Sequence, residues 1–273
     1  MPGSQTKFIG ILAILIVAII IASYGMQGYV LRRRPHVKDI WVINLDKDTD
    51  RLSSVLSQTH HIADIVHRWP AVNGKTLKRE TIREEGIGYA MTRTGNQKDD
   101  LAGVLRNAGV VGCYLSHKRL LQHLASLDVP EYYGHLIVED DVQFPADFLK
   151  PGDAWHGLYT KIPTDWDIVY FDITQPVGKP IAPGIVKLRT SRGGEGNWGT
   201  HAYMVRHSSI QSKILPFLEL MNDAIDEQYN LKFDEWKVYA LTPGLIVPHE
   251  THSKNSSLLK MNVGADDSAV LSY

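Results

Sequence analysis

The sequence predicts an α/β fold in which short buried strands alternate with helices and end in polar loops. Residues 39–45 are an apolar run rich in β-branched and aromatic side chains, and a helical pattern follows from about 49 to 59. The runs 136–138 and 166–171 are similar strands, and acidic residues follow each of them. With 273 residues, 44% of them hydrophobic and 22% charged, the chain is long enough to bury these strands in one domain.

The polar loop behind the first strand is predicted to hold an anionic ligand. Thr49 or Asp50 is placed to cap the following helix, whose first backbone N–H groups would then face the ligand. Arg51 would add a charge-assisted contact to a phosphate. The alternative for this segment alone is a surface loop of mixed charge.

Residues 112–124 are predicted to form an amphipathic helix, because their leucines fall near helical spacing. Ser116 and His117 lie in its early turns, where a hydroxyl and an imidazole can bind a sugar or phosphate oxygen. The alternative is that His117 is a structural histidine.

The triplet Glu139-Asp140-Asp141 directly follows the second buried strand, where ligands of open α/β sheets bind. Three carboxylates this close resist ionising together unless a cation or several donors neutralise them, and a hard ion such as Mn²⁺ or Mg²⁺ would do so. Alternate side chains of an extended chain share a face, so Glu139 and Asp141 are the better metal ligands. A hydrated acidic turn is the alternative.

Further elements are predicted towards the C-terminus. The strand 166–171 ends at Asp172, a second candidate for the rim of a cleft. A strand over 199–205 leads into a helix from about 208 to 218, Asp226 follows, and 241–247 supply a last strand.

Composition excludes several classes of protein. A formal net charge of -1 gives no basic excess, so nucleic acid is not expected as a partner. The single cysteine, Cys113, excludes an intrachain disulfide framework and a cysteine-rich zinc site. Its apolar neighbours predict an inert buried thiol.

Residues 8–31 are predicted to anchor the chain in a membrane. The segment is apolar with few interruptions, is long enough to cross a hydrocarbon core, and ends at three arginines. We therefore expect an N-terminal tail over 1–7, a juxtamembrane linker over 32–37 and a folded domain over 38–273. A cleaved signal peptide is the rival interpretation, although the segment has only a poor cleavage site.

The two signals for membrane orientation disagree. The basic residues after the anchor favour a cytosolic domain, whereas the sequon Asn255-Ser256-Ser257 has meaning only in a secretory lumen. The sequence predicts a single-pass protein of the Golgi or endoplasmic reticulum membrane and leaves its orientation open.

Four blocks, in this order, together resemble glycosyltransferase family 25, which contains lipopolysaccharide and collagen galactosyltransferases. The blocks are Val42-Ile43-Asn44-Leu45-Asp46 with Arg51, Gly112-Cys113-Tyr114-Leu115-Ser116-His117, Ile137-Val138-Glu139-Asp140-Asp141 and Gly199-Thr200-His201-Ala202-Tyr203. Two positions depart from the family pattern: Val110-Val111 replace an acidic residue, and residues 248–253 replace the usual C-terminal polar motif.

The resemblance implies a GT-A-type fold, a Rossmann-like domain whose acidic motif holds a divalent metal on a nucleotide-sugar diphosphate. Glu139 and Asp141 match that motif, and His252 in the altered C-terminal block is a candidate to complete the metal shell. The residues expected near the nucleotide are Asn44, Leu45, Asp46, Arg51, Ser116, His117 and Asp140.

The function expected from this resemblance is metal-dependent, inverting transfer of a hexose, galactose in the first instance, from a UDP-sugar to a hydroxyl group of a glycan, glycolipid or glycoprotein. Asp226 is the first candidate for the general base and Asp172 the second. Two other classes stay open: a membrane-anchored sugar- or partner-binding protein without activity, and a metal-dependent hydrolase.

Overall fold

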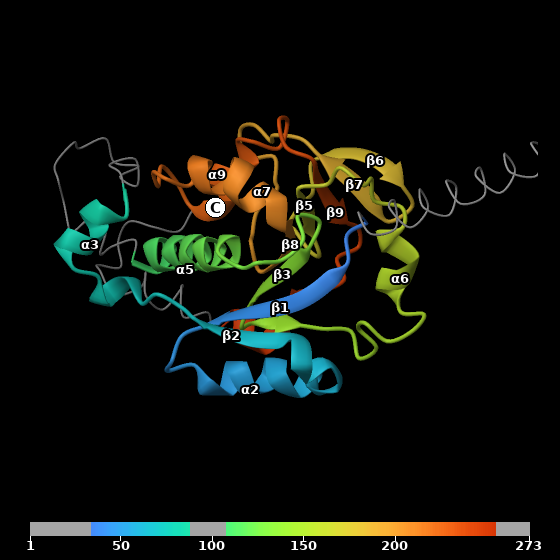
Figure 1. Ribbon diagram of the computed structural model, residues 1–273, viewed down its shortest axis with the longest axis horizontal. Helices are drawn as coiled ribbons and strands as arrows, with labels where there is room; N and C mark the ends of the chain where they lie inside the picture. Colours follow the sequence, from blue (N-terminus) through green and yellow to red (C-terminus); the bar gives the residue numbers. More distant parts are fainter. Residues whose placement is uncertain (1–33, 88–107, 255–273) are drawn as a thin grey trace, which may run out of the picture.

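The computed structural model describes residues 34–87 and 108–254. Its centre is an eight-stranded mixed sheet in the order β2-β1-β3-β8-β5-β9-β7-β6 (Figure 1). The strands of this sheet are β1 (Val37–Asn44), β2 (Val66–Pro70), β3 (Gly134–Glu139), β5 (Ile168–Tyr170), β6 (Gly178–Ala182), β7 (Ile185–Leu188), β8 (Ala202–Arg206) and β9 (Val238–Leu241). A separate pair joins β4 (Val142–Gln143) to β10 (Val247–Pro248).

Helices lie on both faces of the sheet. The α-helices are α2 (Thr49–Gln58), α3 (Arg79–Glu84), α5 (Ala108–Ala125), α6 (Ala154–Tyr159), α7 (His207–Ser209), α8 (Leu215–Phe217), α9 (Ile225–Asn230) and α10 (Glu250–Lys254). The described residues also form two 3₁₀ segments, η1 (His60–Ile65) and η2 (Gly74–Thr76), and the π-helical turn η4 (Ile210–Ile214). Figure 1 shows α5 and α9 on one side of the sheet and α6 on the other.

The core consists of two layers, one on each face of the sheet. In β8, Tyr203 and Val205 belong to the layer under α5, whereas Ala202 and Met204 belong to the layer under α2 and α6. Strands β1 and β3 divide their apolar side chains in the same alternating way. Because successive strand residues point to opposite faces, an almost unbroken apolar strand fits a sheet covered on both sides.

The strand directions bring several chain segments to one edge of the sheet. Strands β1, β2 and β3 are parallel, β8 runs antiparallel to β3, and β5 and β9 run parallel to each other and antiparallel to β8. The carboxyl ends of β1, β3 and β5 and the start of β8 therefore meet. At this edge Ile43 lies opposite Glu139, and Val138 lies opposite Ala202.

The predicted α/β class is confirmed, and several boundaries differ. The first strand begins at Val37, which we expected in the linker, and α2 is preceded by Asp48 as its N-cap, not by Thr49 or Asp50. The side chain of Asp48 makes no capping hydrogen bond. The sequence pattern did not separate these three neighbouring polar residues, because both aspartate and threonine favour caps.

The last long strand was placed too late. We expected it over 241–247, but β9 ends at Leu241, and a turn with a cis bond before Pro243 precedes the short β10. Proline in the middle of a central strand would remove a ladder hydrogen bond, so Pro243 marks the end of the strand. The expected helix from 208 to 218 is present as the consecutive helical segments α7, η4 and α8.

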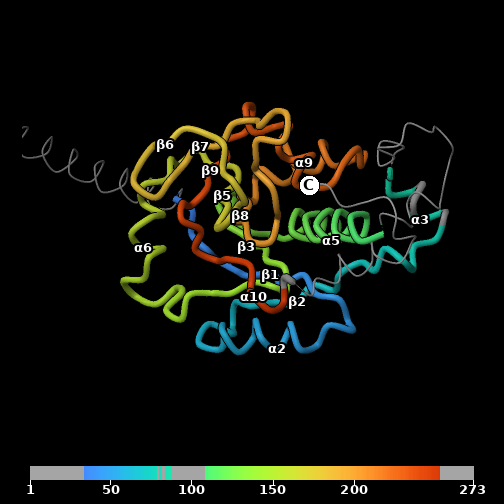
Figure 2. Tube along the Cα trace, turned by 180° about the vertical axis from the view of Figure 1, so that it is seen from behind, coloured from blue at the N-terminus to red at the C-terminus, as the bar shows by residue number. Residues whose placement is uncertain are grey.

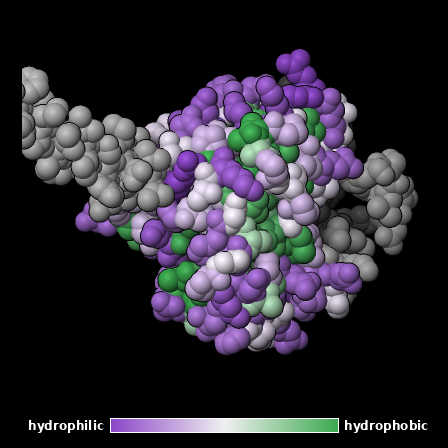
Figure 3. Space-filling model, turned by 90° about the vertical axis from the view of Figure 1, so that its right-hand side faces the viewer, coloured by the Kyte–Doolittle hydropathy of each residue, from purple (hydrophilic) through white to green (hydrophobic). Residues whose placement is uncertain are grey.

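One face of the described surface is mostly polar. On the face in Figure 3, hydrophilic residues cover most of the area and hydrophobic ones lie in patches between them. The most exposed large hydrophobic side chains belong to four separate segments: Leu56, Ile181, Leu220 and Leu231. No helix within 34–87 or 108–254 has the length and apolar character needed to cross a membrane. The predicted anchor at 8–31 and the sequon at 255–257 lie outside the described residues.

Candidate functional site

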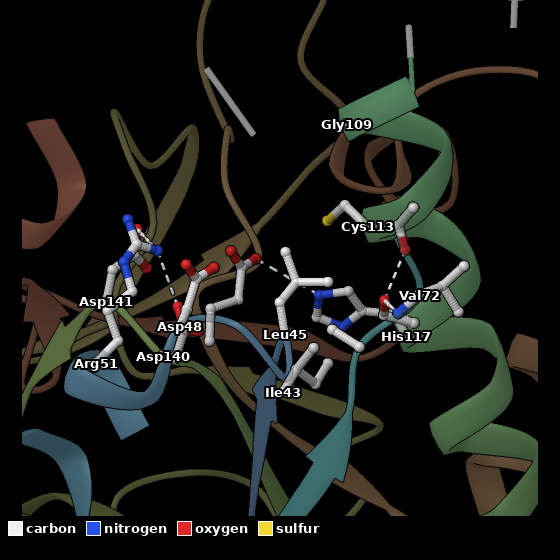
Figure 4. Close-up of a pocket in the computed structure, with 14 residues that line it drawn as sticks. Ile43, Leu45, Asp48, Arg51, Val72, Gly109, Cys113, His117, Asp140 and Asp141 are labelled. Carbon is white, nitrogen blue, oxygen red and sulfur yellow. Dashed lines mark hydrogen bonds and ion pairs between the residues drawn. The ribbon is translucent and has the colours of Figure 1, made fainter. Parts of the chain in front are cut away.

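An open pocket lies at the edge where β1, β2 and β3 end. Figure 4 shows Cys113 and His117 of α5 on one side of it, and Asp48, Arg51, Asp140 and Asp141 on the other. The lining residues are Ile43, Leu45, Asp48, Arg51, Ala71, Val72, Gly109, Gly112, Cys113, Ser116, His117, Glu139, Asp140 and Asp141. Chain segments far apart in sequence thus line one cavity that carries several acidic side chains.

Close backbone packing sets α5 against this edge. A Cβ atom added at Gly112 would lie 2.6 Å from the carbonyl oxygen of Val72, and one added at Gly74 would lie 1.8 Å from that of Ala108. Both are closer than non-bonded atoms approach, so only glycine permits this contact. The Ser116 hydroxyl donates to the Gly112 carbonyl at 2.6 Å and accepts from the Val72 N–H at 2.8 Å, which ties the helix to the segment after β2.

Asp140 is neutralised by donors from β1 and α2. The Arg51 Nη1 donates to Asp140 Oδ1 at 2.9 Å, and Asn44 Nδ2 donates to Asp140 Oδ2 at 2.7 Å. Both partners of the ion pair are about 90% buried, with side-chain exposures of 10% each. The other guanidinium nitrogen, Arg51 Nη2, donates to the carbonyl of His252 at 2.8 Å, so it also holds α10 beside α2 (Figure 2).

Glu139 points towards α5 and β8. Its Oε1 lies 3.5 Å from His117 Nε2 and accepts a hydrogen bond from the Thr200 hydroxyl at 3.2 Å. Burial acts to raise the pKa of Glu139, but the neighbouring imidazole of His117, followed by His201 and Thr200, outweighs burial and lowers it. Glu139 is therefore an anion inside the pocket.

Asp141 is less well compensated than its neighbours Asp140 and Glu139. Its Oδ2 is 3.9 Å from Arg51 Nη1, beyond a hydrogen bond. Burial first, and then the charge of Glu139, raise the pKa of Asp141 to about 6. The pocket therefore holds negative charge that a bound cation would stabilise. Glu139 and Asp141 fit a hard divalent ion, because both offer carboxylate oxygens.

The raised pKa of Asp141 predicts a pH-dependent loss of stability in the metal-free chain. An unfolded aspartate titrates near 3.9, so the folded chain binds this proton more tightly than the unfolded chain does. The contribution of this proton to the free energy of unfolding is fully present below about pH 4. It is lost as the pH rises through about 6 and is absent at higher pH.

The substitution Asp141→Asn removes the ionisable carboxyl group and with it the pH-dependent loss of stability. With a chelator present, we expect the variant to gain about 2–3 kcal/mol relative to wild type between pH 4 and pH 7.5, measured by denaturant unfolding. Asp147→Asn, at an exposed carboxylate nearby, is the matched control. A constant difference between Asp141→Asn and wild type across this range would contradict the expectation.

The other predicted residues of the nucleotide and metal sets lie in different settings. Leu45 lines the pocket and Asn44 holds the lining residue Asp140, whereas Asp46 is exposed and pairs with Arg68. The Ser116 hydroxyl is already bonded to the backbone, as described above. The His252 ring packs on His249 with centroids 4.4 Å apart, and only its carbonyl group bonds to Arg51.

The two candidate bases lie near the pocket but not among its described lining residues. Asp172 Oδ2 pairs with His201 Nε2 at 2.8 Å, and both side chains are partly exposed. Asp226 lies at the start of α9, where its Oδ2 accepts from the Gly199 N–H at 2.9 Å. Each carboxylate is therefore held by a group from the segment 199–201.

Sequence reasoning missed Thr200, His201, Asp48 and Cys113 as site residues. Thr200 and His201 stand in the fourth family block directly before β8, and their place opposite the end of β3 was the available signal. Cys113 was expected to be an inert thiol in the core. It is half-buried and lines the pocket beside His117, although it also packs against the apolar layer under α5.

The fold and the pocket define an α/β protein with a polar ligand site beyond the carboxyl ends of its parallel strands. The pattern of Glycosyltransferase family 25 (LPS biosynthesis protein) matches residues 37–162. This region contains the lining residues of the pocket. Residues 37–162, a little under half of the chain, are therefore similar to glycosyltransferase family 25.

Curated relatives carry the same family name. A glycosyltransferase 25 family member of Anopheles gambiae is 29% identical over 136 residues, which are 48% of this chain and 21% of the relative. The human procollagen galactosyltransferase 2 is 25% identical over 48% of the chain and 20% of its own length. A bovine protein described as a probable inactive glycosyltransferase 25 family member 3 is 23% identical over 80% of the chain and 38% of its own length. The chain thus spans about one fifth of the first two relatives.

Proposed function

We propose that the chain transfers a hexose, galactose in the first instance, from a UDP-sugar to a hydroxyl group of a glycan, glycolipid or glycoprotein, on a GT-A-type fold. The observation that carries this proposal is the arrangement of Glu139 and Asp141 around one pocket at the carboxyl edge of the sheet, with Arg51 beside them. The similarity of residues 37–162 to glycosyltransferase family 25 supports this class of reaction.

Glu139 and Asp141 are the residues that would hold Mn²⁺ or Mg²⁺, with His252 as a further candidate ligand. When bound, such an ion acts as a Lewis acid for the negative charge that develops on the leaving diphosphate. Arg51 is already committed to Asp140 and to the His252 carbonyl, so it acts by fixing the carboxylates and by adding positive charge to the pocket. Leu45 and Asp48 would border the nucleotide, and Asn44 would act through Asp140.

The acceptor hydroxyl needs a base, because its alkoxide is too basic to form freely at neutral pH. Asp226 and Asp172 are the candidates, and an inverting reaction requires the base on the face opposite the leaving group. The pairing of Asp172 with His201 gives a second way to accept the proton, with the imidazole as the base and Asp172 orienting it. In either route the proton of the acceptor hydroxyl passes to a side chain that belongs to, or is held by, the segment 199–201.

A binding protein without turnover is the second candidate, since the bovine relative that matches most of the chain is described as probably inactive. The test is to incubate the purified full chain with UDP-galactose or UDP-glucose and a panel of acceptors, with and without Mn²⁺. Acceptor-dependent UDP release that needs the ion supports transfer. Release of free sugar with water alone indicates a hydrolase, and donor binding without any release indicates the binding protein.

We also propose that residues 8–31 anchor the chain in a Golgi or endoplasmic reticulum membrane. The apolar length of this segment and the arginines that follow it support the proposal. Partition of the full chain into the carbonate-resistant membrane fraction, and its loss on deletion of 8–31, is the expected result.

A further inference from the structure

A second group of potential ligands lies in the pocket, on the side away from Arg51. Cys113, His117 and Glu139 each place one ligand atom within 4.8 Å of the other two. Cys113 and His117 are four residues apart on α5, so they project from the same face of the helix (Figure 4). Glu139 approaches from the end of β3.

His117 is the residue that points to a ligand. Its side chain is fully buried, and its Nε2 has no hydrogen-bond partner among the described residues, with Glu139 Oε1 as an acidic neighbour at 3.5 Å. Its other ring nitrogen, Nδ1, lies 3.0 Å from the Tyr203 hydroxyl. A histidine that ligates a metal usually donates its second N–H to an oxygen, and Tyr203 provides one here. Nε2 is then left with a lone pair directed into the pocket.

The chemistry of the three groups differs from that of the carboxylate pair. A thiolate, an imidazole and a carboxylate favour a borderline cation, and three protein ligands with one open position is a common arrangement for zinc. Ligands of a tetrahedral zinc ion stand roughly 3.5 Å apart, so side chains now up to 4.8 Å apart need to close by about 1 Å. The flexible Glu139 side chain and the half-buried Cys113 can make this adjustment.

We propose that Cys113, His117 and Glu139 form a second cation site, selective for a borderline divalent ion such as Zn²⁺. Binding forms one sulfur–metal bond and releases the thiol proton to solvent, with no change of oxidation state. Because Glu139 is shared, an ion held here takes a ligand from the pair Glu139 and Asp141. If the proposed transferase function holds, Zn²⁺ at this site therefore inhibits it.

The test of binding uses Co²⁺ as a spectroscopic substitute for Zn²⁺ in the full, reduced chain. We expect a thiolate-to-cobalt charge-transfer band that saturates at one ion per chain and disappears when Zn²⁺ is added. The chain has a single cysteine, so such a band reports on Cys113 alone. Cobalt binding without this band would overturn the proposal, and so would no binding at all.

Variants separate the ligands from a general effect on folding. Cys113→Ala is expected to lose the band, and His117→Gln to weaken Co²⁺ binding by more than about 100-fold. His60→Gln, at an exposed histidine, is the matched control and should bind as wild type does. Near-ultraviolet circular dichroism of each metal-free variant checks the fold. If His117→Gln does not fold, Tyr203→Phe replaces it, with an expected weakening of about 10–100-fold.

A separate measurement tests the inhibition. With Mn²⁺ held constant, the ratio of transfer with Zn²⁺ to transfer without it should fall in wild type and stay near one in Cys113→Ala. Equal Zn²⁺ sensitivity in the two proteins would overturn the inhibitory role. If the chain shows no transfer activity, the proposed function is wrong, but the proposed cation site is not affected. The cobalt spectrum tests that site independently of activity.

Discussion

Replacing Asp141 with asparagine is expected to lower UDP-sugar transfer about a thousandfold and to leave the fold intact. The amide keeps the shape of the side chain but removes the charge that would hold a divalent ion against the leaving diphosphate, and loss of such stabilisation costs about 10²- to 10³-fold or more. Metal-dependent UDP release at saturating donor is the measurement. Because Asp141 is a source of repulsion with Glu139 in the metal-free chain, the variant should not be less stable above pH 6.

Asp147→Asn is the control for this experiment. Its carboxylate is exposed six residues further along the chain, so it should transfer at the wild-type rate. Wild-type turnover by Asp141→Asn with every donor and acceptor tried would remove Asp141 from the metal site.

Replacing Arg51 with methionine is expected to lower the free energy of unfolding by about 3–5 kcal/mol. The substitution leaves the buried carboxylate of Asp140 with only Asn44 as its donor, and an uncompensated buried charge typically costs that much. It also removes the hydrogen bond from Arg51 to the carbonyl of His252. Denaturant unfolding at neutral pH measures the loss.

The double variant Arg51→Met/Asp140→Asn distinguishes an unpaired charge from lost packing. Removing the charge of Asp140 should recover part of the stability that Arg51→Met loses. A double variant no more stable than Arg51→Met alone would show that the ion pair is not the source of the effect.

Much of the fold could be predicted from the sequence, because β1 and β3 are buried on both faces and are therefore almost continuously apolar. The strand ends were also informative, since polar residues follow directly on the apolar runs at Asn44 and Glu139. The last strand was misplaced, because Leu241 and the apolar run 245–247 were joined into one strand although Pro243 and Gly244 separate them. Short apolar runs do not by themselves separate a strand from a buried turn.

The site was predictable where its residues are neighbours in sequence. Glu139, Asp140 and Asp141 could be assigned to a pocket, but their different partners could not, because those partners come from β1, α2, α5 and the segment before β8. The roles of Cys113 and His201 depend on which way α5 and β8 lie across the sheet. Hydrophobic periodicity identifies such helices and strands, but it does not indicate how they are oriented relative to one another.

The contact of Gly112 with the Val72 carbonyl has a consequence for how this pocket can vary. A side chain at position 112, even a single methyl group, would force α5 outwards and carry the imidazole and the thiol away from the acidic strand end. The depth of the cavity thus depends on the absence of a Cβ atom at position 112. Changes in ligand preference are therefore easier to obtain by substituting side chains that line the cavity than by shifting the backbone of α5.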